Sequence, residues 1–207
     1  RLAQAVAGLR FDRFDVDFRN HRTNATFAST DNLLSPRLGL IYKPVEPVSV
    51  YSSYSLTYLP RAGDQLSSPS LTNQSLGPEK VTNYGARGKW DLRSSLSLTA
   101  AVYHLNRTNV VVPDPNDATR SILVDGQRTN GIELGAAGSI TPSWTVMGGY
   151  AYQDGRITNT LSATAKDGAR LAQVPRHSFS LWNRYNVTPH LGIAAGVIHN
   201  ADMFTST

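Results

Sequence analysis

Residues 131–154 alternate between large apolar side chains and small or polar ones with a period of two, interrupted once by the segment 141–143. Leu134 lies on the apolar parity before this segment, and Trp144 and Tyr150 lie on it afterwards. A period of two predicts strands, and a three-residue connection between them predicts an antiparallel hairpin. An apolar face with aromatic ends, opposite a face of small or polar residues, is typical of strands that face lipid.

The same period recurs along the chain and predicts nine strands. The expected strands are 3–19, 35–43, 48–59, 79–91, 96–112, 121–140, 144–157, 171–187 and a last one that starts at 191. The expected connections alternate between long loops at 20–33, 60–76, 113–120 and 158–169 and short turns at 44–47, 91–95, 141–143 and 188–190. Around residues 103–105 the parity becomes ambiguous, and a β-bulge would account for this.

Strict alternation of long and short connections is typical of an up-and-down barrel in a bacterial outer membrane, with short turns on the periplasmic side. The expected strands exceed the roughly 9–11 residues that cross the apolar slab. Nine is an odd number, and bacterial single-chain barrels have an even number of strands. The sequence therefore predicts an all-β fold, a partial transmembrane antiparallel barrel of about nine strands, cut from a larger one.

The strand parity also predicts which side chains lie on the convex outer face, against lipid. These residues are Leu38, Leu40, Val50, Tyr54, Tyr84, Trp90, Ile132, Leu134, Trp144, Tyr150, Phe179, Leu181 and Tyr185. The opposite parity carries charged and small polar residues such as Arg37, Lys43, Arg87 and Arg184, which we expect to line a water-filled lumen.

Four phrases of the sequence, in this order and spacing, carry a resemblance to a known family. They are SPRLGLIYKP, SLGPEKVTNYGARGKWDL, NGIELGAAGSITPSWTVMGGYAYQDGRI and VPRHSFSLWNRYNVTP. The chain resembles the C-terminal half of the barrel of TonB-dependent siderophore receptors, and residues 168–187 and 191–203 are similar to the catecholate-type members. The resemblance implies a barrel of about 22 strands with a plugged lumen. It further implies a bacterial outer-membrane location and uptake of ferric siderophores powered by TonB. Residues 1–207 would then be a fragment of the barrel domain, without the plug domain, the TonB box or the closing strands.

Other functional classes find little support. The sequence contains none of the motifs GxSxG, Walker A or HExxH, and its five histidines are scattered singly, so we expect no enzyme. Cysteine is absent, which excludes disulfides and thiolate metal sites. The net charge of +5 invites a nucleic-acid interpretation, but the cations fall singly along strands and form no basic run.

The expected ligand is a ferric siderophore, whose iron is already coordinated, so the protein needs no metal ligands and no cofactor of its own. It needs aromatic groups for stacking and arginines for charge-assisted hydrogen bonds. The qualifying residues at strand ends and in the outer loops are Tyr58, Arg61, Arg120, Arg156 and Arg170. The expected partners are the ferric siderophore, TonB and outer-membrane lipid. The alternatives are a passive porin, a TonB-dependent receptor for a non-iron substrate and, more distantly, a soluble β-rich binding protein.

Overall fold

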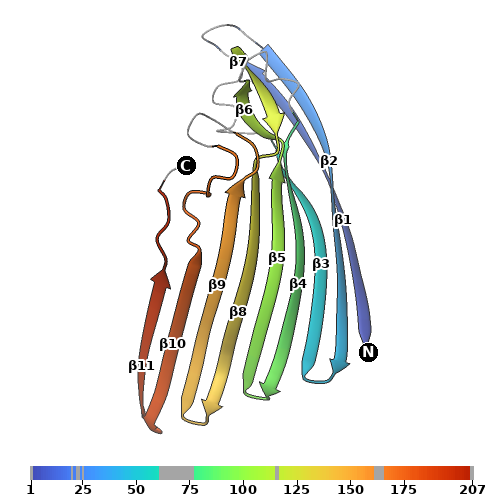
Figure 1. Ribbon diagram of the computed structural model, residues 1–207. Helices are drawn as coiled ribbons and strands as arrows, with labels where there is room; N and C mark the ends of the chain where they lie inside the picture. The colour runs from blue at the N-terminus through green and yellow to red at the C-terminus, as the bar shows by residue number, and fades with distance from the viewer. Residues whose placement is uncertain are drawn as a thin grey trace.

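The chain forms one curved sheet of nine antiparallel strands, with a separate two-stranded hairpin at one end (Figure 1). The computed structural model describes residues 2–19, 21, 24, 26–60, 77–114, 117–160 and 166–205, apart from the side chains of residues 27, 111–114 and 117–124. The strands are β1 (Ala3–Arg19), β2 (Thr26–Val45), β3 (Val48–Leu59), β4 (Glu79–Arg93), β5 (Leu96–Thr108), β6 (Val110–Asp114), β7 (Asp117–Val124), β8 (Gln127–Thr141), β9 (Trp144–Ile157), β10 (His177–Thr188) and β11 (Leu191–Asn200).

The large sheet is a meander with the order β1-β2-β3-β4-β5-β8-β9-β10-β11, and β6 pairs only with β7. Two-residue turns join β2 to β3, β4 to β5, β8 to β9 and β10 to β11. All four lie at one end of the sheet, the turn end, and the long connections lie at the other, the loop end (Figure 1). The predicted antiparallel meander of about nine strands is confirmed. In the part of the chain that the structure describes, no helix is long and apolar enough to cross a membrane.

The pairing register places every residue of the predicted lipid-facing set on one face of the sheet, here called the apolar face. Leu38 pairs with Tyr54, which pairs with Tyr84. Two rows nearer the turn end, the row that starts at Val50 leads through Leu134 and Tyr150 to Phe179. Directly paired residues project to the same side of a sheet. The opposite, polar face carries Arg87 and Lys89 among small residues.

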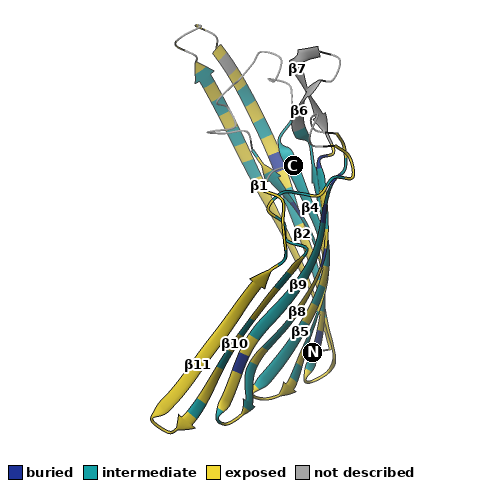
Figure 2. Cartoon of the chain, turned by 60° about the vertical axis from the view of Figure 1, so that its left-hand side comes forward, coloured by how far each residue is buried: buried dark blue, intermediate teal, exposed yellow. Residues whose placement is uncertain are grey.

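Exposure differs between the two faces in the middle of the sheet. On β5, Ala100 and Val102 of the apolar face are exposed, whereas Ala101 and Tyr103 of the polar face are half-buried. The side chains of a curved sheet crowd on its concave side, so this difference indicates that the apolar face is convex. Strand β11, at the sheet edge, is exposed along its whole length (Figure 2).

The structure corrects the prediction of a long loop at residues 20–33. Strand β1 continues to Arg19, and β2 already begins at Thr26, so both project far beyond the neighbouring strands as a hairpin. A polar cross-strand contact supports this extension, since the Thr30 hydroxyl of β2 donates to Asp15 Oδ1 of β1 over 2.8 Å. Within β1, Arg13 Nε lies 3.0 Å from Asp15 Oδ2. One face of the extension is polar, and the other combines Phe14, Val16 and Phe18 of β1 with Ser29 and Asp31 of β2. The hydrophobic period of β1 therefore has no counterpart in residues 26–32 of β2.

Four further predictions are wrong. Strand β5 ends at Thr108 because Asn109 adopts a left-handed conformation with φ of 60°, and the expected loop 113–120 lies within the hairpin β6–β7. Strand β10 begins at His177 rather than at residue 171, since Gln173 has φ of 58° and Pro175 cannot donate to a ladder. No bulge occurs at 103–105, where the pairing with β4 and β8 is continuous.

Candidate functional site

The loop end of the sheet holds the predicted ligand-binding residues, and the structure describes three of the five side chains. Arg61 lies outside the described residues. Arg120 lies in β7, and its side chain is also outside what is described. Of the remaining three, the structure brings Arg156 and Arg170 together, whereas Tyr58 lies on β3, which three strands of the sheet separate from the β9 strand of Arg156.

Tyr58 is half-buried near the end of β3 and pairs with Lys80 of β4. It shares the parity of Tyr54 and Leu56, so it lies on the apolar face beyond the aromatic residues of that face. A tyrosine with an apolar body and a polar tip suits the boundary between an apolar and a wet environment.

Arg156 and Arg170 face each other across an isolated antiparallel bridge. The Arg156 guanidinium donates from Nε to Asp154 Oδ1 over 2.9 Å and from Nη1 to the Gly168 carbonyl over 3.0 Å. Asp154 also lies 3.8 Å from Arg176 Nη2. This carboxylate therefore partly neutralises two arginines and holds the segment after residue 165 against β9. Arg156 pairs with Arg128 of β8, which places this group on the apolar face, beyond its apolar part.

A second cluster, on the polar face, was not anticipated from the sequence. Arg107 of β5 donates to Glu79 Oε2 from Nη2 over 2.6 Å and from Nε over 2.8 Å, and its Nη1 donates to Gln127 Oε1 over 3.3 Å. Both partners of the ion pair are largely shielded, with 35% and 17% of their side-chain surface exposed. The parity of Arg107 could have suggested its face, but its contact with Glu79 depends on the register between β4 and β5.

Further toward the turn end, the polar face carries both charge and exposed apolar groups. Lys89 Nζ lies 3.0 Å from Asp91 Oδ1, and Asp91 also accepts a hydrogen bond from Ser97. Trp182 is 51% exposed and lies over Gly196 of β11, so closely that a Cβ at this glycine would overlap the indole ring. Glycine is required at this close approach.

The loop end of the sheet carries groups that are suited to binding a ligand. Among the described residues, no three His, Asp or Glu side chains gather as a metal-binding group. The described groups at the loop end include arginines, Tyr58 and the carboxylates of Asp154 and Glu79. Arginine and tyrosine can contact anionic or polar chelates through hydrogen bonds and stacking.

The chain matches the profile of a protein family over residues 2–204, and the family is described as TonB dependent receptor-like, beta-barrel. It is 34% identical to the probable TonB-dependent receptor BfrD of Bordetella pertussis over 97% of this chain. The crystal structure of the siderophore receptor PiuA from Acinetobacter baumannii superimposes with a TM-score of 0.80 at 29% identity over 96% of this chain. The closed form of the ferric-catecholate import receptor Fiu from E. coli K12 superimposes with a TM-score of 0.78 at 25% identity over 98% of this chain.

All these relatives are much longer than the chain described here. It covers 28% of BfrD, 31% of the PiuA chain and 33% of the Fiu chain. The similarity therefore concerns about a third of each relative or less.

Proposed function

Because this chain belongs to the TonB-dependent receptor-like β-barrel family, we propose that it forms part of an outer-membrane receptor that takes up ferric siderophores with energy supplied through TonB. The observation that carries the proposal is a nine-stranded meander with one apolar and one polar face, matched over almost its whole length to siderophore receptors. The turn end would lie on the periplasmic side and the loop end outside the cell.

The proposed ligand class is a ferric catecholate, since Fiu is named for catecholate import and PiuA for siderophores. Iron in such a chelate is cargo with its coordination already complete. The protein contributes stacking and charge-assisted hydrogen bonds at the extracellular end, which suits the arginines and tyrosines there. A receptor of the same family for a different metal chelate is the alternative.

The five predicted contacts divide into two groups by their position. Arg61 and Arg120 belong to the long outer connections, and we propose them as the principal contacts. Tyr58, Arg156 and Arg170 share the apolar face of the sheet, away from the lumen, and Arg156 is already engaged by Asp154. We therefore expect these three to contribute less to ligand binding.

The test is equilibrium binding of ferric catecholates and hydroxamates to the purified full-length receptor. A charge-assisted hydrogen bond contributes about 1.5–3 kcal/mol, so Arg61→Ala/Arg120→Ala should weaken binding at least ten-fold. Arg156→Ala/Arg170→Ala should weaken it less. The matched control is Arg184→Ala, which removes an exposed arginine of the polar face near the turn end. Unchanged binding in the first double variant refutes the assigned contacts, and no binding by any ferric chelate refutes the siderophore assignment.

A further inference from the structure

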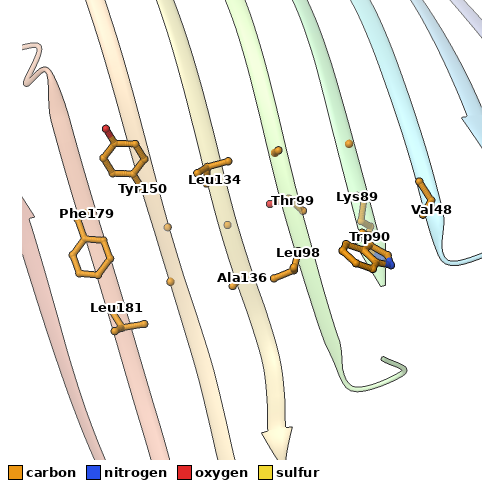
Figure 3. A pocket seen from close by; sticks show the side chains of 15 residues that line it. Val48, Lys89, Trp90, Leu98, Thr99, Leu134, Ala136, Tyr150, Phe179 and Leu181 are labelled. Atoms are coloured by element: carbon orange, nitrogen blue, oxygen red, sulfur yellow. The ribbon is translucent and has the colours of Figure 1, made fainter. Parts of the chain in front are cut away.

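The apolar face carries a shallow hollow of about 610 Å³ that crosses strands β3 to β10 (Figure 3). Small residues form its floor: Gly88 pairs with Ala100, and Ala136 pairs with Gly148. A Cβ added at Gly88 would meet nothing within 4 Å, so the space above it is open. Large side chains surround this floor, and those labelled in Figure 3 include Trp90, Leu98, Leu134, Tyr150, Phe179 and Leu181.

An aromatic row borders the hollow toward the loop end. The rings of Tyr54 and Tyr84 lie 5.1 Å apart, and His104 follows on β5 at 6.3 Å from Tyr84. On β9 and β10, His177 lies 5.3 Å from Tyr152 and accepts or donates a hydrogen bond of 2.8 Å with the hydroxyl of Tyr150. Tyrosines in such a row mark the level at which the hydrocarbon of a bilayer meets the headgroups.

Cations lie beyond the aromatic row, on the same face. Arg128 of β8 pairs with Arg156 of β9, which bridges to Arg170, and Lys80 lies on the same face of β4. Arg128 and Arg170 are exposed. On β4, β5, β8 and β9, the described residues of this part of the face include one carboxylate, Asp154, which lies near Arg156 and Arg176. The cations exceed it in number, so this part of the face is positively charged.

The spacing of these features matches one leaflet of a membrane. Six residues separate Leu134 in the hollow from Arg128 on the same strand, about 20 Å at ~3.3 Å per residue. For a strand tilted by ~40°, this is about 15 Å along the membrane normal. Leu134 lies about 5 Å from the midplane, since the apolar residues of β8 from Ile132 to Ile140 are centred two residues away, so Arg128 lies about 20 Å from the midplane, just outside the ~15 Å half-thickness of the hydrocarbon core. An acyl chain lying in the hollow would therefore bring its headgroup to the level of the cations.

We propose that strands β4 to β10 bind one lipid of the outer leaflet, with a phosphate-bearing headgroup at Lys80 and Arg128 and an acyl chain in the hollow. Arginine fits phosphate because its planar donors can form two parallel hydrogen bonds with it. The strands that form the site are β4, β5, β8, β9 and β10, and each has a paired neighbour on both sides, so the site does not depend on the sheet edges. It lies on the face opposite the lumen and is independent of the proposed siderophore function.

The test uses the purified full-length receptor in a nonionic detergent, titrated with lipid A, which carries phosphates and several saturated acyl chains. Native mass spectrometry measures the apparent Kd for bound lipid. In the wild type, lipid A should bind roughly three- to ten-fold more tightly than its dephosphorylated form, because two partly exposed cations lose their partner. Equal binding of the two lipids overturns the headgroup site, and this comparison requires no variant.

Matched variants then locate the site on the apolar face. Lys80→Ala/Arg128→Ala should weaken lipid A binding roughly three- to ten-fold, since both cations are partly exposed and screened. Arg87→Ala/Lys89→Ala removes two cations from the polar face of β4 and should leave the Kd unchanged. Equal effects of the two double variants overturn the placement of the headgroup.

Two further variants test whether an acyl chain binds in the hollow. Ala100→Phe fills the floor of the hollow and should weaken lipid A binding, whereas Ala5→Phe adds the same bulk to the apolar face of β1, outside the hollow. Equal binding by Ala100→Phe and Ala5→Phe refutes the acyl-chain site. Binding of ferric chelate, measured on each variant, confirms that the receptor is folded and separates failure of this site from failure of the proposed function.

Discussion

An arginine in place of Leu134 tests which face of the sheet meets lipid. Leu134 is 51% exposed on the apolar face of β8, and its neighbours across the strands are Ala100 and Tyr150. The apolar residues of β8 on this face run from Ile132 to Ile140, so Leu134 lies two residues from their centre. This corresponds to about 5 Å from the membrane midplane at ~3.3 Å per residue and a tilt of ~40°.

At this depth, Leu134→Arg should destabilise the barrel by about 2–3 kcal/mol, within the range for arginine near the midplane and reduced because its long side chain can reach toward the headgroups. The matched control is Ala137→Arg, which places the same charge on the polar face of the same strand, between Ser97 and Met147. There the guanidinium should remain in water, and the cost should be below about 1 kcal/mol, as for substitutions outside the lipid face.

The assay is urea unfolding of the full-length receptor in lipid vesicles, together with the fraction of heat-resistant receptor assembled in the outer membrane. Leu134→Arg should lower the urea midpoint and the assembled fraction well below those of Ala137→Arg. If the two variants unfold at the same urea concentration, the assignment of the apolar face to lipid is refuted, whatever the absolute stability.

Three further outcomes follow from the structure. Gly196→Val should lower the free energy of unfolding by about 1–3 kcal/mol, because the new side chain overlaps the Trp182 ring. Gly88→Ala adds a methyl group to open space and should cost less than about 1 kcal/mol, so equal urea midpoints of the two variants would contradict this reasoning. Arg107→Ala should cost about 1–3 kcal/mol by leaving the shielded Glu79 without its partner, and adding Glu79→Gln should restore part of the loss in a double-mutant cycle. In the β1–β2 extension, hydrogen bonds from Thr30 and Arg13 hold the pKa of Asp15 below its ordinary value of 3.8, against some desolvation. The ionised Asp15 therefore contributes to the stability of the extension above pH 3.8, and this contribution is lost as the pH falls through the folded-state pKa. Amide protection of the extension should fall with acidification in this range, and Asp15→Asn should remove that pH dependence.

Sequence parity alone determined the two faces of the sheet. Wherever a strand crosses the bilayer, its alternate residues meet lipid and water, so the positions of Leu38, Tyr84, Leu134 and Phe179 could be assigned before any pairing was known. The positions of the short turns were equally accessible, since Pro47 and Pro142 interrupt the period of two. Their length was not, because the predicted turns of three to five residues are turns of two residues in the structure. The parity of Tyr58 and Arg156 also placed them on the apolar face, although their residue types suggested ligand contacts.

Only the tertiary structure decided what happens beyond the bilayer. In the β1–β2 extension, Phe14, Val16 and Phe18 keep a period of two on β1, but residues 26–32 of β2 show none, and Asn109 ends β5 through its backbone conformation. The register was also undetermined, because a period of two fixes the face of a residue but not its partner on the next strand. Register brings Arg107 to Glu79, stacks Tyr54, Tyr84 and His104 in one row, and sets Arg128 and Arg156 side by side above the hollow. These contacts join neighbouring strands of the meander, and their geometry depends on the hydrogen-bonded register between those strands.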